Sequence, residues 1–247
     1  MQDKFHDSAG VPWEGRQFES NNWASDDGSA PEGLSRALVH NPLDKKVLFD
    51  ALADSRLLIP LVAELGDVGV GAHGQAVDKS ADLAIVAVST PDGKTAIPAF
   101  SSVEEMARWR PEARPVPVAA AKVALAAASE GHERVVIDAA SSAIAIRRPA
   151  LAALAQGLEW VPPHKNPRVK ELVSIAALTQ AKISSVDLFD HDPSGRLEKA
   201  ELLIQLGLRP GITPDQLREI LEGFNQELQT QEFISLVDSI AMKIVVA

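Results

Sequence analysis

The stretch from residue 81 to residue 118 constrains the fold most, because it contains a complete supersecondary unit. Two apolar runs, Leu83 to Val88 and Thr95 to Phe100, flank a turn at Pro91-Asp92-Gly93. Proline and glycine at a turn between two β-prone runs predict a β-hairpin. The first firm expectation for this chain is therefore a pair of antiparallel strands.

A helix is predicted directly after this hairpin. It begins at Ser101 or Ser102, where Glu104 and Glu105 can complete capping boxes, and it ends before Pro111. Strands and helices that alternate within one short segment are typical of proteins that combine both elements in one core. The unit therefore predicts the α+β fold class.

Helix and strand signals recur on both sides of this unit. Pro60 within the predicted strand Leu57 to Ala63 places that strand at a sheet edge or a bulge, because proline cannot donate to the ladder. Ser29-Ala30-Pro31-Glu32 predicts a capping box at the start of the first helix. The further elements expected before residue 163 are helices at Asn41 to Asp54, Ala119 to Ser129 and Pro149 to Gly157, and strands at Val135 to Asp138 and Ile144 to Ile146.

The length of 247 residues predicts two domains, each of which could bury its own core. Trp160-Val161-Pro162-Pro163 is the expected boundary between them. We expect an N-terminal arm at 1–28, an α+β domain with a mixed sheet at 29–163, and a smaller α+β domain at 164–247. The smaller domain reads as helix, strand, strand, helix and strand, which predicts a sandwich with its helices on one sheet face.

Charge and cysteine content exclude several classes of protein. The net charge of −10 opposes binding to nucleic acid and to anionic lipid. No apolar run approaches the roughly 18 residues that a membrane-spanning helix needs, and no signal peptide pattern is present. The chain contains no cysteine, which excludes disulfides and thiolate chemistry and suits a reducing compartment. We expect a cytoplasmic protein that binds neither nucleic acid nor membrane.

The first 28 residues combine a polar, tail-like composition with four aromatic residues. Phe5, Trp13, Phe18 and Trp23 are unusual in such a segment, since polar tails have few groups to bury. The arm either docks on its own chain, or contacts a second copy, or reaches another protein. Self-docking and a homo-oligomer contact are the two preferred readings.

Residues 69–74 match the spacing of a dinucleotide-binding loop. Such a loop needs a helix behind it, whose N-terminus holds the phosphates. The sequence from Gln75 to Asp82 leads to another strand and not to a helix. We therefore expect a loop between strands here, without a bound nucleotide.

Residues 190–201 match the template of a calcium-binding loop. Helices flank such a loop in calcium-binding proteins, whereas strand-prone residues flank this one. The preferred reading is a solvated loop turned by Pro193-Ser194-Gly195. The weaker alternative is a metal site whose ligands are Asp190, Asp192, Ser194 and Glu201.

No set of residues predicts a catalytic centre or a bound cofactor. The six histidines are scattered, and no nucleophile elbow or phosphate-binding loop of the Walker type occurs. Three residues near the helix that follows the hairpin remain candidates for contact with a ligand or a partner: Phe100, Trp109 and Arg114. Packing is the competing role for the aromatic pair, and a structural ion pair is the competing role for the arginine.

Several motifs together resemble the SseB family, in particular its two-domain actinobacterial branch. The motifs are Asp92-Gly93, Ile97 to Ser102, Trp109, Ala113 to Pro117, Asp26 to Ser29, Asp78-Lys79, Asp138, Leu154 to Gly157 and Asp192 to Leu197. The resemblance covers nearly the whole chain, and it supports the solvated loop over the calcium site at residues 190–201.

The resemblance implies little chemistry. Members bear the name enhanced serine sensitivity protein, and the family supplies no catalytic residues to transfer. It is sometimes labelled a type III secretion component, but the secretion proteins that share the name need membrane-inserting or coiled-coil segments, which this sequence lacks.

We therefore expect a non-enzymatic cytoplasmic protein that acts through protein contacts or self-association. The alternative is a protein or enzyme that binds an amino acid or another metabolite in a cleft between its domains, near Phe100, Trp109 and Arg114.

Overall fold

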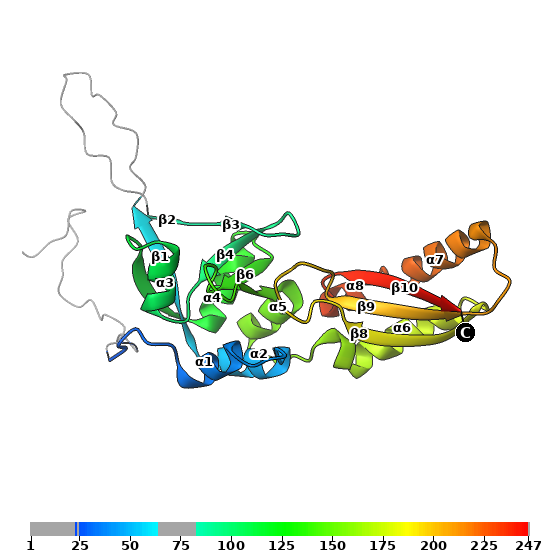
Figure 1. Cartoon of the computed structure of the whole chain (residues 1–247), viewed down its shortest axis with the longest axis horizontal. Helices are drawn as coiled ribbons and strands as arrows, with labels where there is room; N and C mark the ends of the chain where they lie inside the picture. The colour runs from blue at the N-terminus through cyan, green and yellow to red at the C-terminus, as the bar shows by residue number, and fades with distance from the viewer. Residues whose placement is uncertain (1–22, 24, 64–82, 247) are drawn as a thin grey trace, which may run out of the picture.

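The computed structural model describes Trp23, residues 25–63 and residues 83–246. The aromatic residues Phe5, Trp13 and Phe18 lie outside the described residues, as do Asp78-Lys79 and the glycine-rich segment at 69–74. The fold is α+β, as the sequence predicts, and the described residues form helices and three separate sheets. The chain forms an elongated molecule in which the elements after residue 163 extend away from the earlier ones (Figure 1).

The N-terminal part contains two of the sheets. The strands of the antiparallel sheet, in spatial order, are β2 (Leu83–Ile85), β1 (Arg56–Ala63) and β5 (Arg114–Ala119). Those of the mixed sheet are β3 (Val88–Ser89), β4 (Thr95–Ala99), β6 (Arg134–Ile137) and β7 (Ile144–Arg147). A bridge between Leu58 and Phe100 links the two sheets. Within the mixed sheet β4 and β6 are parallel, and their other neighbours are antiparallel.

The hairpin predicted at residues 83–100 forms, but it is shorter than its apolar runs. Gly93 has a φ of 78° and donates its N–H to the carbonyl of Thr90, which closes the turn between β3 and β4. Only Val88 and Ser89 pair with β4, because β2 pairs instead with β1 in the other sheet. The first apolar run is therefore divided between two sheets.

In the described residues of this part, five helices cover these sheets: α1 (Glu32–Leu38), α2 (Lys45–Ala53), α3 (Val103–Trp109), α4 (Ala120–Ser129) and α5 (Arg148–Gln156). Buried aliphatic residues of α1, α2, α4 and α5 pack with those of β1, β4, β6 and β7 in one core. The capping box predicted at Ser29 is wrong. Helix α1 begins at Glu32 without a side-chain cap, and the Ser29 hydroxyl donates to Asp27.

The edge or bulge predicted from Pro60 is also wrong, since β1 is the middle strand of its sheet and its register with β5 is regular. Leu58 uses both its N–H and its C=O to bond Phe100, so these groups point away from β5. Pro117 faces Leu58, and Pro115 faces Pro60 two residues further along the ladder. Alternate antiparallel pairs are not hydrogen-bonded, and the prolines occupy these positions, where no donor is needed.

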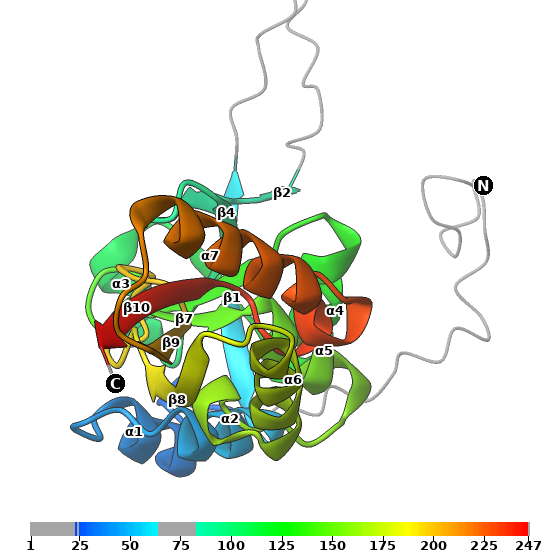
Figure 2. The ribbon, with the colours of Figure 1, turned by 90° about the vertical axis from the view of Figure 1, so that its right-hand side faces the viewer.

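The C-terminal part has a sheet of its own. Its strands are β8 (Ile183–Asp190), β9 (Leu202–Leu208) and β10 (Ile240–Val246), with β9 in the middle, antiparallel to β8 and parallel to β10. The helices are the short 3-10 helix η1 (Pro163–Lys165), α6 (Pro167–Leu178), α7 (Pro214–Leu228) and α8 (Gln231–Leu236), of which α8 was not predicted. Viewed along the sheet, α6 and α7 lie on the same side of the strands (Figure 2).

The buried side chains of this part form a second core cluster, which shares no residue with the first. The predicted division of the chain at residues 28 and 163 stays a prediction. Among the described residues, no helix is both long enough and apolar enough to cross a membrane.

Candidate functional site

Two strands of the mixed sheet end at the same place and bring polar residues together. Strands β4 and β6 are parallel, and Ala99 lies opposite Ile137 at their ends. The residues that follow, Ser101 and Asp138, therefore emerge at one sheet edge. Ligands of open sheets with parallel strands commonly bind beyond the carboxyl ends of those strands. This edge of the sheet is therefore a candidate binding site.

A groove of about 620 Å³ lies at this edge. We call it the polar groove. It is bounded by the segment before α1, by α1 itself, by the first turn of α3 and by the turn between β6 and β7. Its lining residues are Asp27, Gly28, Ser29, Ala30, Ser35, Leu38, Val39, Ser101, Ser102, Val103, Glu104, Glu105, Asp138, Ser141 and Ser142. Six serines and four carboxylates line the groove, and none of these residues is basic.

Asp138 is the buried acid of the groove, with 3% of its surface exposed. Its two carboxylate oxygens accept from the N–H and from the hydroxyl of Ser101, each at 2.8 Å. Burial raises the pKa of Asp138 above its usual value, and the two hydrogen bonds from Ser101 oppose that rise only in part. Asp138 also has a positive φ of 53°, which aspartate tolerates better than most residues.

The segment Asp26–Ser29 forms one wall of the polar groove, and a buried arginine fixes it. Arg56 donates to the carboxylate of Asp26 and to the carbonyls of Ser29 and Ser101. The hydrogen bond from Arg56 is the main reason that the pKa of Asp26 is lowered. The carbonyl of Gly28 accepts from the N–H of Val103, which joins this wall to the start of α3.

Acidic residues of α3 form the opposite wall. Glu105 accepts a hydrogen bond from Ser141 at 2.5 Å, which connects α3 to the turn after β6. Arg108 pairs with Glu104 at 2.6 Å and with Glu105 at 3.1 Å from an exposed position beside the groove. One arginine therefore balances part of the acidic charge.

The three residues predicted as contact candidates do not come together in a cleft. Phe100 is fully buried and packs on Trp109, with ring centroids 5.3 Å apart. Leu58 and Met106 complete this small cluster. Arg114 is exposed on β5 and is not part of the cluster. The aromatic pair is thus packing, and the cleft predicted from all three residues is not formed.

Trp109 does line a different groove, of about 350 Å³. The N-terminal part contributes Thr90 and Pro91 to its wall, and the C-terminal part contributes Arg196 and Glu198. This groove is mostly apolar and lies between the two parts of the chain. A cleft between the domains was expected near Phe100, Trp109 and Arg114, and of these three residues Trp109 alone lines this groove.

Carboxylates and arginines meet a second time, where the two parts of the chain join. Arg147 donates to Asp192 at 2.6 Å and to Asp238 at 3.0 Å, and Arg134 donates to the same oxygen of Asp238 at 2.9 Å. Arg134 also pairs with Asp92 at 3.0 Å. Hydrogen bonds to the carboxylates raise the pKa of Arg147, although burial opposes that rise. We call these residues, together with Glu201, the arginine network.

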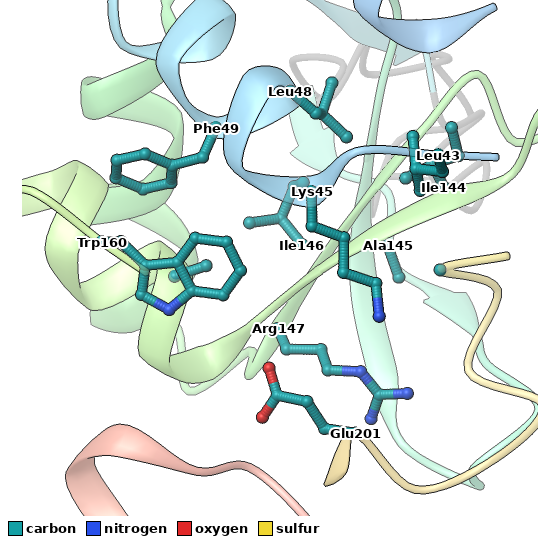
Figure 3. Close-up of a pocket in the computed structure, with 12 residues that line it drawn as sticks. Leu43, Lys45, Leu48, Phe49, Ile144, Ala145, Ile146, Arg147, Trp160 and Glu201 are labelled. Atoms are coloured by element: carbon teal, nitrogen blue, oxygen red, sulfur yellow. The ribbon is translucent and has the colours of Figure 1, made fainter. Parts of the chain in front are cut away.

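Glu201 is the acid of this network that lacks a guanidinium bonded to it. Its carboxylate accepts the N–H of Asp238 at 2.7 Å. Burial raises the pKa of Glu201 to about 7, and the nearby carboxylate of Asp238 adds to that effect. Glu201 also borders a small cavity of about 30 Å³ together with Lys45, Arg147 and Trp160 (Figure 3).

Two of the four residues proposed as metal ligands pair with cationic side chains of the protein. Lys45 binds Asp190 at 2.7 Å, and Arg147 binds Asp192. The loop turns through Gly195, whose carbonyl accepts from the N–H of Ala145 in β7. The turn at Pro193-Ser194 is exposed, as predicted, whereas Asp192 and Gly195 beside it are buried, so the loop is solvated only in part. In the described part of the chain, no three histidine or acidic residues are arranged to hold a metal ion.

The sequence analysis identified several residues of these sites but not their roles. Ser101 was assigned as a possible cap and Asp138 as the end of a strand, and the parallel pairing of β4 with β6 is what joins them. Arg134 and Arg147 were not singled out. A basic residue within or next to a short apolar strand was the available signal, because such a residue needs a partner when it is buried.

The fold and the groove define an α+β protein with an open polar site on its N-terminal part. Residues 34–153 match the model of the SseB protein N-terminal domain. Through this segment the chain belongs to the SseB family, as the sequence motifs indicated. The comparison with curated proteins and that with solved structures returned no significant match.

Proposed function

We propose that this SseB-family protein is a non-catalytic cytoplasmic protein that binds a segment of a partner protein in the polar groove. The observation that carries the proposal is the groove itself, where the ends of β4 and β6 place Ser101 and Asp138 beneath an opening of about 620 Å³. That volume lies within the range of established ligand sites.

The composition of the groove suits a polypeptide. Serine hydroxyls both donate and accept, so they can pair with the N–H and the C=O groups of an extended chain. Apolar side chains stand beside them, with Val39 77% exposed and Val103 42% exposed. A partner segment could cover these two valines while its backbone bonds the serines. Exposed apolar side chains next to a polar site are typical of interaction surfaces.

The chemistry of the groove supports binding without catalysis. Ser101 is 3% exposed, and its hydroxyl donates to Asp138. A serine nucleophile needs a base that withdraws its proton, most often a histidine. The groove is lined by no histidine among the described residues. The absence of cysteine from the sequence supports a reducing compartment such as the cytoplasm.

A substitution that fills the groove tests the proposal. Ser35 is exposed on α1 and lines the groove, so Ser35→Trp adds bulk there without disturbing the core. Ser174→Trp on the exposed face of α6 is the matched control. Crosslinking followed by affinity purification from native lysate should recover the same partner with the wild type and the control, and lose it with Ser35→Trp. Recovery of that partner by Ser35→Trp would contradict the proposal.

The groove at Trp109 supports a second candidate function, the binding of a small metabolite. Arg196 and Glu198 supply one group of each charge beside an apolar wall, which suits an amino acid. A thermal-shift screen of amino acids would test it. A ligand that raises the melting temperature of the wild type, and not that of Arg196→Ala, would favour this function over the first.

A further inference from the structure

We propose that the partner segment is basic, and that a lysine or arginine side chain of it enters the polar groove toward Asp138. This inference rests on the proposed function and specifies the chemistry of the partner. It depends on three features of the groove: its charge, the environment of Asp138, and the charge of the other candidate occupants.

The lining of the groove is acidic. Asp27, Glu104, Glu105 and Asp138 all contribute carboxylates, and Arg108 beside the groove pairs with Glu104 and Glu105 and offsets only part of this charge. Asp27 is exposed, and its pKa is lowered by hydrogen bonds from Ser29, so it stays ionised at neutral pH. Clefts lined by one sign of charge concentrate ligands of the opposite sign.

Asp138 lacks a cation in a position where buried acids usually have one. Asp192 and Asp238 in the arginine network each bond a guanidinium. Among the described residues, Asp138 has no ion pair, and its oxygens receive only the neutral donors of Ser101. Burial is the main cause of its raised pKa, and the nearby charge of Glu105 adds to that rise. An ammonium or guanidinium from outside would supply the missing opposite charge.

The surrounding groups suit the rest of such a side chain. The hydroxyl oxygens of Ser102, Ser141 and Ser142 can accept from the N–H groups of a guanidinium or an ammonium. Leu38, Val39 and Val103 can cover its methylene groups, since lysine and arginine pack their stems on apolar surface.

The other candidate occupants from this chain carry the wrong charge. Residues 1–22 contain four acidic and two basic residues, and the whole chain has a net charge of −10. Neither its own N-terminal arm nor a second copy complements an acidic groove. A separate protein with a basic segment does.

Fluorescence anisotropy at about 150 mM NaCl with a labelled, capped hexalysine peptide tests the inference. The groove variant is Asp27→Asn combined with Glu104→Gln. The matched control is Glu219→Gln combined with Glu222→Gln, two exposed residues of α7 that change the net charge equally. We expect the groove variant to bind at least about tenfold more weakly, and the control to stay within about twofold of the wild type.

Three results would overturn the inference: no binding of hexalysine by the wild type, an equal loss in both variants, or tighter binding of a hexaglutamate peptide. Spermine tests whether a free amine binds as well as a peptide does. If spermine binds as tightly as hexalysine and loses affinity in the same variant, the occupant would not be a protein segment. If the hexalysine result overturns this inference but Ser35→Trp still abolishes partner capture, the proposed function stands. Partner capture that is unaffected by Ser35→Trp would remove both.

Discussion

The polar groove and the arginine network both contain aspartate and glutamate side chains, but these side chains have opposite roles in the two regions. Asp192 and Asp238 are buried against guanidinium groups and hold the two parts of the chain together. Asp27 and Glu104 face an open groove, and the carboxylate of Asp138 beneath them bonds Ser101 alone among the described residues. The two regions differ in their cations: the network contains two arginines, whereas none of the lining residues of the groove is basic.

The positions of the arginines explain this division. Arg134 begins β6 and Arg147 ends β7, and they lie directly opposite each other in the antiparallel pair. The two guanidinium groups therefore reach the C-terminal part from one edge of the mixed sheet. Asp138 follows the other end of β6, beyond their reach. The same strand thus supplies a closed interface at one end and an open site at the other.

Of the predicted changes, the substitution of Arg147 in the arginine network should have the largest effect on stability. Arg147→Ala leaves Asp192 and Asp238 with fewer opposite charges in a buried setting, and we expect a loss of about 3–5 kcal/mol in the free energy of unfolding. Urea titration followed by circular dichroism measures it. Arg36→Ala removes an exposed pair with Glu32 and should cost less than about 1 kcal/mol. Equal losses for the two variants would show that the network does not stabilise the fold.

Glu201 should make the closed region sensitive to pH. Its pKa is raised from 4.5 to about 7, so the folded state holds a proton that the unfolded state releases more easily. The contribution of Glu201 to stability is therefore fully present below about pH 4.5 and is lost as the pH rises toward 7 and above. Glu201→Gln keeps an oxygen for the N–H of Asp238 without a titrating group. At pH 8 this variant should be more stable than the wild type by roughly 3 kcal/mol.

Urea titrations of both proteins at pH 5 and pH 8 check this prediction. The wild type should approach the stability of Glu201→Gln at the lower pH and fall below it at the higher one. A constant difference between the two proteins across this range would show that Glu201 does not hold a proton in the folded state.

In the polar groove, the residue to compare with Glu201 is the buried acid Asp138. Asp138→Ala removes the acceptor of two buried hydrogen bonds and places alanine at a positive φ, and we expect a loss of about 2–3 kcal/mol. Asp138→Asn retains an acceptor for the N–H of Ser101 and tolerates the same backbone, so it should cost less than about 1 kcal/mol. Thermal unfolding compares the two. If the asparagine variant loses as much as the alanine variant, the ionised carboxylate itself stabilises the fold.

Local signals in the sequence predicted most elements. The cap at Ser102 and the glycine after α5 fix helix ends through neighbouring residues, and the structure has these ends as predicted. The errors arose where a distant partner decides. Ser29 has the pattern of a helix cap, but Asp27 and Arg56 hold the segment in another conformation. Strand β1 can lie at the centre of its sheet because Pro60 and the two prolines of β5 occupy pairs that are not hydrogen-bonded between these strands.

The candidate site was less predictable, for the same reason. Phe100 and Trp109 are large and aromatic, which suggested contact with a ligand, but Phe100 is buried in the core and the partly buried Trp109 packs against it. Ser101 and Asp138 lie 37 residues apart in the sequence, and only the parallel pairing of β4 with β6 joins them. Composition carries no information about strand order, so the polar groove could not be derived from the residues alone.

The smallest predicted effect separates a wall of the groove from an ordinary turn. Gly28 and Gly93 both have positive φ, at 81° and 78°, so alanine strains the backbone by about 1 kcal/mol at either position. A Cβ at Gly28 would also lie 2.6 Å from the Cγ2 of Val103, whereas one at Gly93 would contact nothing within 4 Å. Because the carbonyl of Gly28 is bonded to the N–H of Val103, the wall cannot move away without losing that bond. We expect Gly28→Ala to lower the free energy of unfolding by about 1 kcal/mol more than Gly93→Ala, and to weaken hexalysine binding where Gly93→Ala does not. Equal stability and equal binding of the two variants would mean that the segment Asp26–Ser29 does not shape the groove.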